Sequence, residues 1–78
     1  NKYVGRIEVS KNYAFVVPDY RKMHQDFFVY PENINGAKTN DKVIVEIINW
    51  GGAEKSPEAK VVEILGKAGE NEAEIHSI

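Results

Sequence analysis

The sequence predicts a small all-β domain within its 78 residues. Three observations favour this fold class. Five short segments are rich in β-branched and aromatic residues, and clusters of Gly, Pro, Asn, Asp and Ser separate them. The connection after the third segment is longer than the others. No apolar run approaches the roughly 20 residues that a transmembrane helix needs, so we expect no membrane partner.

The first strand is expected over residues 3–9. Tyr3, Ile7 and Val9 fall on one of its faces, and Arg6 and Glu8 fall on the other, which is the alternation of a half-buried strand. The turn-prone segment that follows is short. We therefore expect strands one and two to form a hairpin.

The second and third strands are expected over residues 12–17 and 26–30, with a polar loop between them. Because successive side chains on a strand point to opposite faces, antiparallel pairing would give two distinct faces. One face supplies the core with Ala14, Val16, Phe27 and Val29. The other carries four aromatic rings that could stack on bases, namely Tyr13, Phe15, Phe28 and Tyr30.

The next segment, residues 31–41, is rich in turn formers and has room for a single helical turn near Ile34. Residues 42–50 are the most hydrophobic stretch, and their β-branched content predicts the fourth strand. At its end, Trp50 is expected to cap the core or contact another domain rather than stack on RNA.

The fifth strand is expected over residues 59–65 and is closed by Gly66, after a hairpin loop bracketed by Gly51-Gly52 and Ser56-Pro57. Which of its faces is buried stays open. Further on, Asn71 and Glu74 resemble a capping box, so residues 67–78 are expected to form a linker and the start of a helix leading to another domain. Residues 1–66 then form a five-stranded antiparallel barrel of the OB type, with a small SH3-like barrel as the alternative.

The net charge of −2 argues against a strong nucleic-acid binder, but the charge is unevenly distributed. Residues 1–40 have a balance of +2, whereas residues 41–78 have a balance of −4. The half that carries the aromatic rings is therefore the basic half. Four basic side chains in it are candidates for phosphate contacts: Arg6, Lys11, Arg21 and Lys22.

The sequence offers no catalytic site. Metal-dependent RNA cleavage needs several carboxylates that converge, whereas Asp19, Asp26 and Asp41 are scattered at strand ends. His24 and His76 stand alone and are expected to be surface residues. We expect no catalytic residue, metal or cofactor in this chain.

The absence of cysteine fits a reducing cytoplasm, which is the location we expect. The start at Asn1 suggests that the chain is a piece of a longer protein.

Several motifs together resemble cold-shock domains. Residues 11–16, Lys-Asn-Tyr-Ala-Phe-Val, resemble the first ribonucleoprotein motif of that family, and residues 27–30, Phe-Phe-Val-Tyr, resemble the second. The likeness is closer to the ribonuclease R branch of the ribonuclease II family, whose second N-terminal cold-shock domain has a similar ending. Four segments match that branch in order and spacing: residues 15–19, 26–29, 34–37 and 61–66.

The resemblance implies an RNA-binding module of a hydrolytic 3′-to-5′ exoribonuclease. Such a module would guide single-stranded RNA to a catalytic domain outside this chain, and the Mg²⁺-binding aspartates would lie in that domain. Asn12 and Ala14 replace the glycines of the first motif, and Tyr30 replaces a histidine of the second, so we expect weak RNA binding by the module alone. The other expected partners are neighbouring domains of the parent chain. A structural spacer and a free-standing cold-shock RNA chaperone are the alternatives.

Overall fold

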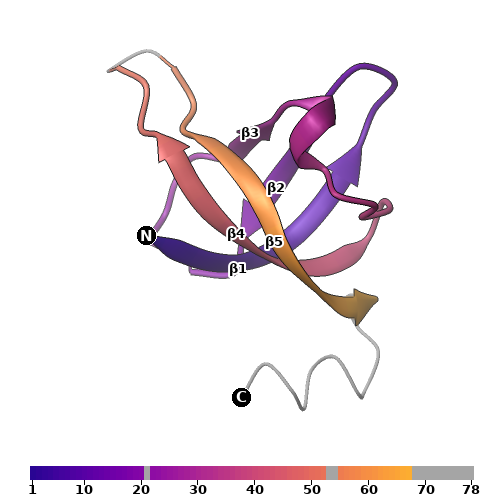
Figure 1. Cartoon of the computed structure of the whole chain (residues 1–78). Helices are drawn as coiled ribbons and strands as arrows, with labels where there is room; N and C mark the ends of the chain where they lie inside the picture. Colours follow the sequence, from indigo (N-terminus) through magenta and orange to yellow (C-terminus); the bar gives the residue numbers. More distant parts are fainter. Residues whose placement is uncertain (21, 53–54, 68–78) are drawn as a thin grey trace.

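A computed structural model of the chain describes residues 1–20, 22–52 and 55–67. It confirms the all-β prediction, because five strands close into a barrel and the described helical structure is one short 3₁₀ turn (Figure 1). The strands are β1 (Lys2–Val9), β2 (Ala14–Pro18), β3 (Phe27–Val29), β4 (Asp41–Asn49) and β5 (Glu58–Lys67), and the turn is η1 (Pro31–Asn33).

The strand order around the barrel is β1-β2-β3-β5-β4, with β4 pairing back onto β1. β1 pairs antiparallel with β2 and β4, β2 with β3, and β4 with β5, and β5 lies between β3 and β4. This is the OB arrangement expected from the sequence, rather than the SH3-like alternative. β3 and β5 pair in parallel, where Phe28 is opposite Glu58 and the Phe28 amide donates to the Pro57 carbonyl at 2.8 Å.

The interior of the barrel is filled by the inward positions of all five strands. The predicted core face of β2 and β3 is confirmed, since its four residues are fully buried. On β5 the inward residues are Ala59 and Val61, which settles the face that the sequence left open. The buried apolar cluster consists of Ile7, Ala14, Val16, Phe27, Val29, Ala37, Val43, Val45, Ile47, Ala59 and Val61.

The single helical turn near Ile34 is confirmed, and a tight turn follows it. Asn35 and Gly36 both have positive φ, 54° and 84°, and the Ala37 amide donates to the Ile34 carbonyl at 3.1 Å. Asn and Gly are the residues that adopt two successive positive φ angles most easily. The Asn35 side-chain amide also donates to the Val61 carbonyl, which fixes this turn against β5.

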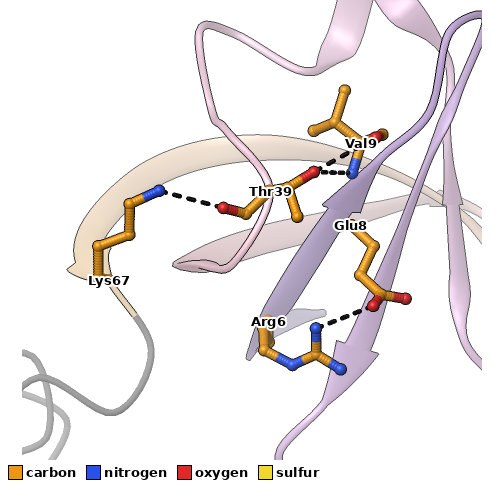
Figure 2. A network of polar contacts seen from close by, with 5 residues as sticks. All are labelled: Arg6, Glu8, Val9, Thr39 and Lys67. Atoms are coloured by element: carbon orange, nitrogen blue, oxygen red, sulfur yellow. Dashed lines mark hydrogen bonds and ion pairs between the residues drawn. The ribbon is translucent and has the colours of Figure 1, made fainter.

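Hydrogen bonds from Thr39 connect the end of β1 to the segment before β4, beyond the last pair of these two strands, Arg6–Lys42. The Thr39 hydroxyl accepts from the Val9 amide at 2.9 Å and lies 3.2 Å from the Val9 carbonyl, so one side chain continues the ladder of β1. Figure 2 shows Thr39 between Val9 and the end of β5, where Lys67 donates to the Thr39 carbonyl at 3.1 Å. The nearly buried side chain of Lys42 on β4 also forms an ion pair with Asp19, which follows β2, at 2.8 Å.

Several strand limits differ from the expected ones. Residues 12–13 precede β2 because the Ser10 amide donates to the Tyr13 carbonyl and closes a turn there. β3 is only three residues long, and β5 extends through Gly66 to Lys67 because it pairs with the start of β4. Arg21 and the expected helix within residues 67–78 lie outside the described residues, apart from Lys67 in β5.

Gly5 allows β1 and β2 to approach closely, which gives a test of the packing. A Cβ at Gly5 would lie 2.5 Å from the Val17 carbonyl oxygen and 2.6 Å from a Val16 methyl. Because one of these atoms is backbone, Gly5→Ala should reduce the free energy of unfolding by about 1–3 kcal/mol, as other overpacking substitutions do. Urea denaturation measures this loss. The control is Gly52→Ala, where nothing lies within 4 Å of the new Cβ; an equal effect of both changes would contradict the close approach.

Asp41 gives a second test, through the pH dependence of stability. Burial by itself raises the pKa of this carboxyl, but the Lys38 amide, donating at 2.8 Å, and the Lys67 ammonium, at 3.1 Å, outweigh burial and hold the pKa below its ordinary value. A lowered carboxyl pKa stabilises the fold above the unfolded value of about 3.9, and this stabilisation is lost as the pH falls through the folded pKa.

Asp41→Asn should therefore cost about 1–2 kcal/mol of unfolding free energy at neutral pH. The difference from the wild type should shrink as the pH is lowered from about 5 towards 2, because acid removes the same charge from the wild type. Urea denaturation across this range measures both quantities, with Asp26→Asn at an exposed position as the control. A gap between Asp41→Asn and the wild type that stays constant with pH would contradict the assignment.

Candidate nucleic-acid interface

The four predicted aromatic residues gather on the outer face of the β2–β3 hairpin. Phe15 and Phe28 are directly opposite each other in the antiparallel ladder, with the core pairs Ala14–Val29 and Val16–Phe27 on either side. The Tyr13 and Tyr30 rings flank this pair and are exposed, at 37% and 44%. Phe15 and Phe28 are half-buried because the neighbouring rings cover them in part. We call these four residues the aromatic face.

Phe28 is the centre of the aromatic face. Its ring is nearly parallel to that of Tyr13, with centroids 5.7 Å apart, and meets Phe15 and Tyr30 edge to face at 5.7 and 4.8 Å. Tyr13 and Phe15 also meet edge to face, at 5.2 Å. The surface is therefore a set of rings at alternating tilts rather than one flat platform. Edge-to-face pairs hold each other in place, so the exposed ring faces are pre-ordered.

A groove of about 580 Å³ continues the aromatic face towards the loop between β4 and β5. Three rings form one wall, and polar residues form the other. This volume lies within the range of about 300–1,000 Å³ that small-molecule sites occupy. The lining residues are Phe15, Phe28, Tyr30, Asn49, Gly51, Lys55, Ser56 and Glu58.

The predicted basic residues do not form one cluster. Arg6 lies on β1, next to the aromatic hairpin, but its guanidinium is 3.1 Å from the Glu8 carboxylate, which neutralises part of its charge (Figure 2). Lys11 is exposed in the turn before Tyr13. Lys22 is exposed in the loop between β2 and β3, at the opposite end of the hairpin. The position of Arg21 is outside the described residues.

The remaining described residues singled out from the sequence are not among the groove-lining residues. Trp50 is about half exposed and meets Tyr3 edge to face at 6.2 Å. Tyr3 in turn contacts Phe27 of the core, with ring centroids 5.4 Å apart, so Trp50 packs over an end of the barrel. His24 is exposed as expected, and His76 lies outside the described residues.

Within residues 1–20, 22–52 and 55–67, no three His, Cys, Asp or Glu side chains come together as metal ligands would. The helical structure in the same residues includes no segment long and apolar enough to cross a bilayer.

Sequence reasoning missed the polar wall of the groove. Asn49 and Glu58 occupy the end of β4 and the start of β5, and Lys55 and Ser56 lie in the loop that joins these strands. The turn signals around that loop predicted a hairpin but did not indicate which β4 and β5 residues would face the aromatic rings. The β4–β5 register contains several shifts, and alternation along the sequence cannot reveal them.

The comparisons with known proteins converge on one kind of domain. The family described as Cold shock domain matches residues 15–78. The chain is 44% identical over 77 residues to Ribonuclease R of Thermotoga maritima, covering 99% of this chain and 11% of that protein. It is 34% identical over 67 residues to Ribonuclease R of Vibrio parahaemolyticus, covering 86% of this chain and 8% of that protein.

A solved structure has a similar fold. RNase R of Mycoplasma genitalium, in complex with double-stranded RNA, superposes with a TM-score of 0.81 at 21% sequence identity, over 97% of this chain and 13% of that one. The chain thus spans about a tenth of the length of the curated relatives described above.

Proposed function

This chain belongs to the cold shock domain family, and from that premise we propose that it is a single-stranded RNA-binding module of a larger ribonuclease resembling Ribonuclease R. The observation that carries the proposal is the aromatic face. Large rings that lie outside a closed core bury little apolar surface within the fold, whereas a stacked base would bury them. OB barrels bind oligonucleotides with this part of the fold, the face of strands two and three and the adjoining loops.

Single-stranded RNA is favoured over duplex RNA by the chemistry of the rings. Stacking on an aromatic side chain requires a base whose face is free, and bases inside a helix are stacked on each other. Lys55 and Ser56, which follow β4, also line the groove beside Phe28. The Mycoplasma protein is in complex with double-stranded RNA, so duplex RNA is a direct comparison for the binding test below.

The charges near the rings support weak binding by the isolated module. Arg6 is paired with Glu8, and Glu58 places a carboxylate in the groove beside Lys55. Phosphate contacts dominate affinity for nucleic acids, and a face with nearly balanced charge provides few of them. Stacking on three or four rings is then the main favourable term, and ordering the flexible strand offsets part of it.

The role that we propose for the parent protein follows from its relatives. The curated relatives described above are named Ribonuclease R and are about ten times longer than this chain. We propose that the parent is a 3′-to-5′ exoribonuclease of the cytoplasm, and that residues 1–66 help guide the RNA 3′ end to a catalytic domain elsewhere in the protein. That domain would carry the catalytic carboxylates and Mg²⁺. The length of the relatives also disfavours a free-standing RNA chaperone.

A structural spacer is the second candidate, because the barrel also exposes apolar side chains away from the rings. Val62 and Ile64 are each 42% exposed on β5, and Ile48 on β4 is 49% exposed. A neighbouring domain that packs on β5 would cover the first two. This role is compatible with RNA binding on β2–β3, unless the aromatic face is itself a protein contact. RNA binding by the aromatic face would therefore exclude only a spacer that uses this face as its protein contact.

The test replaces the most exposed rings of the face. Tyr13→Ala and Tyr30→Ala should each weaken binding of a short oligo-uridine by about 5- to 150-fold, which corresponds to the roughly 1–3 kcal/mol that a stacked base contributes. Tyr20→Ala is the matched control, since Tyr20 is 56% exposed in the loop between β2 and β3. Fluorescence anisotropy at low salt measures affinity, and thermal unfolding verifies that all three variants fold.

Three results would count against the proposal. If the wild type and both ring variants bind oligo-uridine with equal affinity, the aromatic face does not contact RNA. Failure of the wild type to bind any oligonucleotide at low salt would favour the spacer. Tighter binding of a duplex than of a single strand of equal length would contradict the choice of ligand.

A further inference from the structure

One row of residues crosses the outer surface of the barrel and joins the aromatic face to two polar side chains. Phe15 is opposite Phe28, Phe28 is opposite Glu58, and Glu58 is opposite Asn49, so the row runs across β2, β3, β5 and β4. All four side chains line the groove. Neighbouring strands lie about 4.8 Å apart. A base stacked on Phe28 therefore has the Glu58 and Asn49 side chains within reach of its edge.

A bulge in β4 places Asn49 in this row. Ile47 is buried and is opposite the buried Ala59, and the register then shifts so that Asn49, not Ile48, is opposite Glu58. Strict alternation from Ile47 would turn Asn49 inward. Bulges change the direction of a side chain in this way and are common next to binding sites. The bulge therefore brings a second polar group to the groove.

The chemistry of Glu58 and the contacts of Asn49 define which hydrogen bonds each side chain can offer to a ligand. A carboxylate accepts only, through two oxygens. Among residues 1–20, 22–52 and 55–67, no ion pair engages Glu58, so its oxygens are available to a ligand. The Asn49 carbonyl oxygen accepts from the Gly51 amide at 2.8 Å, which orients the side chain and leaves its NH₂ group as the donor for the groove. The polar wall thus presents a pair of acceptors next to a donor.

We propose that this groove selects guanine, with Glu58 and Asn49 reading the Watson–Crick edge of a base stacked on Phe28. This inference rests on the proposed RNA-binding function and names the base that the site prefers. Guanine presents N1–H and the N2 amino group side by side, which match the two Glu58 oxygens, and its O6 lies next to them as an acceptor for the Asn49 amide. Bidentate contacts of this kind are the usual means of base discrimination by side chains.

The other bases fit less well, for the same chemical reasons. Adenine and cytosine have one amino group beside a ring nitrogen lone pair, which would face the second carboxylate oxygen. Uracil has one N–H between two carbonyl oxygens, and both would approach the carboxylate. In each case an acceptor is left opposite an acceptor, and an unsatisfied contact between like partial charges costs binding affinity. Specificity then comes from rejection as well as from attraction.

The experiment varies one nucleotide of an RNA ligand and one side chain of the protein. The ligands are uridine octamers with a single central guanosine, inosine or 7-deazaguanosine. Inosine lacks only the N2 amino group, and 7-deazaguanosine keeps the whole Watson–Crick edge. The wild type should bind the guanosine octamer about tenfold tighter than the inosine octamer, as expected for one charge-assisted hydrogen bond. The 7-deazaguanosine octamer should bind like the guanosine octamer.

Glu58→Gln should abolish this preference, because an amide offers one acceptor where the carboxylate offers two. The matched control is Glu63→Gln, which removes the same charge from the same strand at an exposed position outside this groove. Both substitutions should strengthen binding to the inosine octamer slightly, since each removes a negative charge. Only Glu58→Gln should bring the ratio of guanosine to inosine affinity close to one.

Three other outcomes would each contradict one part of this proposal. Equal affinity of the wild type for the guanosine and inosine octamers refutes guanine selection and leaves RNA binding intact. If the Glu58→Gln variant keeps the preference for guanosine over inosine, Glu58 does not contact the base. If no octamer binds at low salt, the proposed function fails, and guanine selection fails with it.

Discussion

The register between β2 and β3 is the constraint on which the rest of the surface depends. With Phe15 opposite Phe28, the side chains of Ala14, Val16, Phe27 and Val29 turn inward and the other rings turn outward. A slip of one residue in either strand would exchange its two faces, burying rings and exposing Val or Ala. The core pairs Ala14–Val29 and Val16–Phe27 resist such a slip because all four side chains are fully buried. Core packing therefore also determines the geometry of the aromatic face.

Contacts outside the hairpin hold this face in place. β5 pairs with β3 at the bridge between Phe28 and Glu58, where the Phe28 amide donates to the Pro57 carbonyl, and this contact sets Glu58 beside the central ring. Gly5 lets β1 lie closely against β2, and Asp41 ties the start of β4 to the end of β5 through Lys67. The groove is thus formed by strands that are distant in the sequence. Charge around it is nearly balanced, so in the proposed RNA complex ring stacking and base edges would contribute more than phosphate attraction.

Some of this structure was predictable from the sequence. Short-range alternation located the β2–β3 hairpin, its core face and its four outward rings, and the turn formers of residues 31–41 predicted a connection with a single helical turn near Ile34. The polar wall was not predictable. The bulge beside Asn49 and the β3–β5 contact at Glu58 arise from barrel closure, which involves residues far apart in the chain. The pairing of Arg6 with Glu8, two residues apart on one strand, also lowers the charge that composition alone attributes to this region.

The most direct test of the central claim is to observe the rings themselves while RNA is added. Ring ¹H and ¹³C resonances of the chain, followed by NMR during titration with a guanosine-containing uridine octamer, report stacking at each aromatic residue. The account predicts upfield shifts at Tyr13, Phe15, Phe28 and Tyr30, with Tyr3, Tyr20 and Trp50 nearly unchanged. Shifts confined to Trp50 and Tyr3, with the β2–β3 rings unaffected, would contradict it.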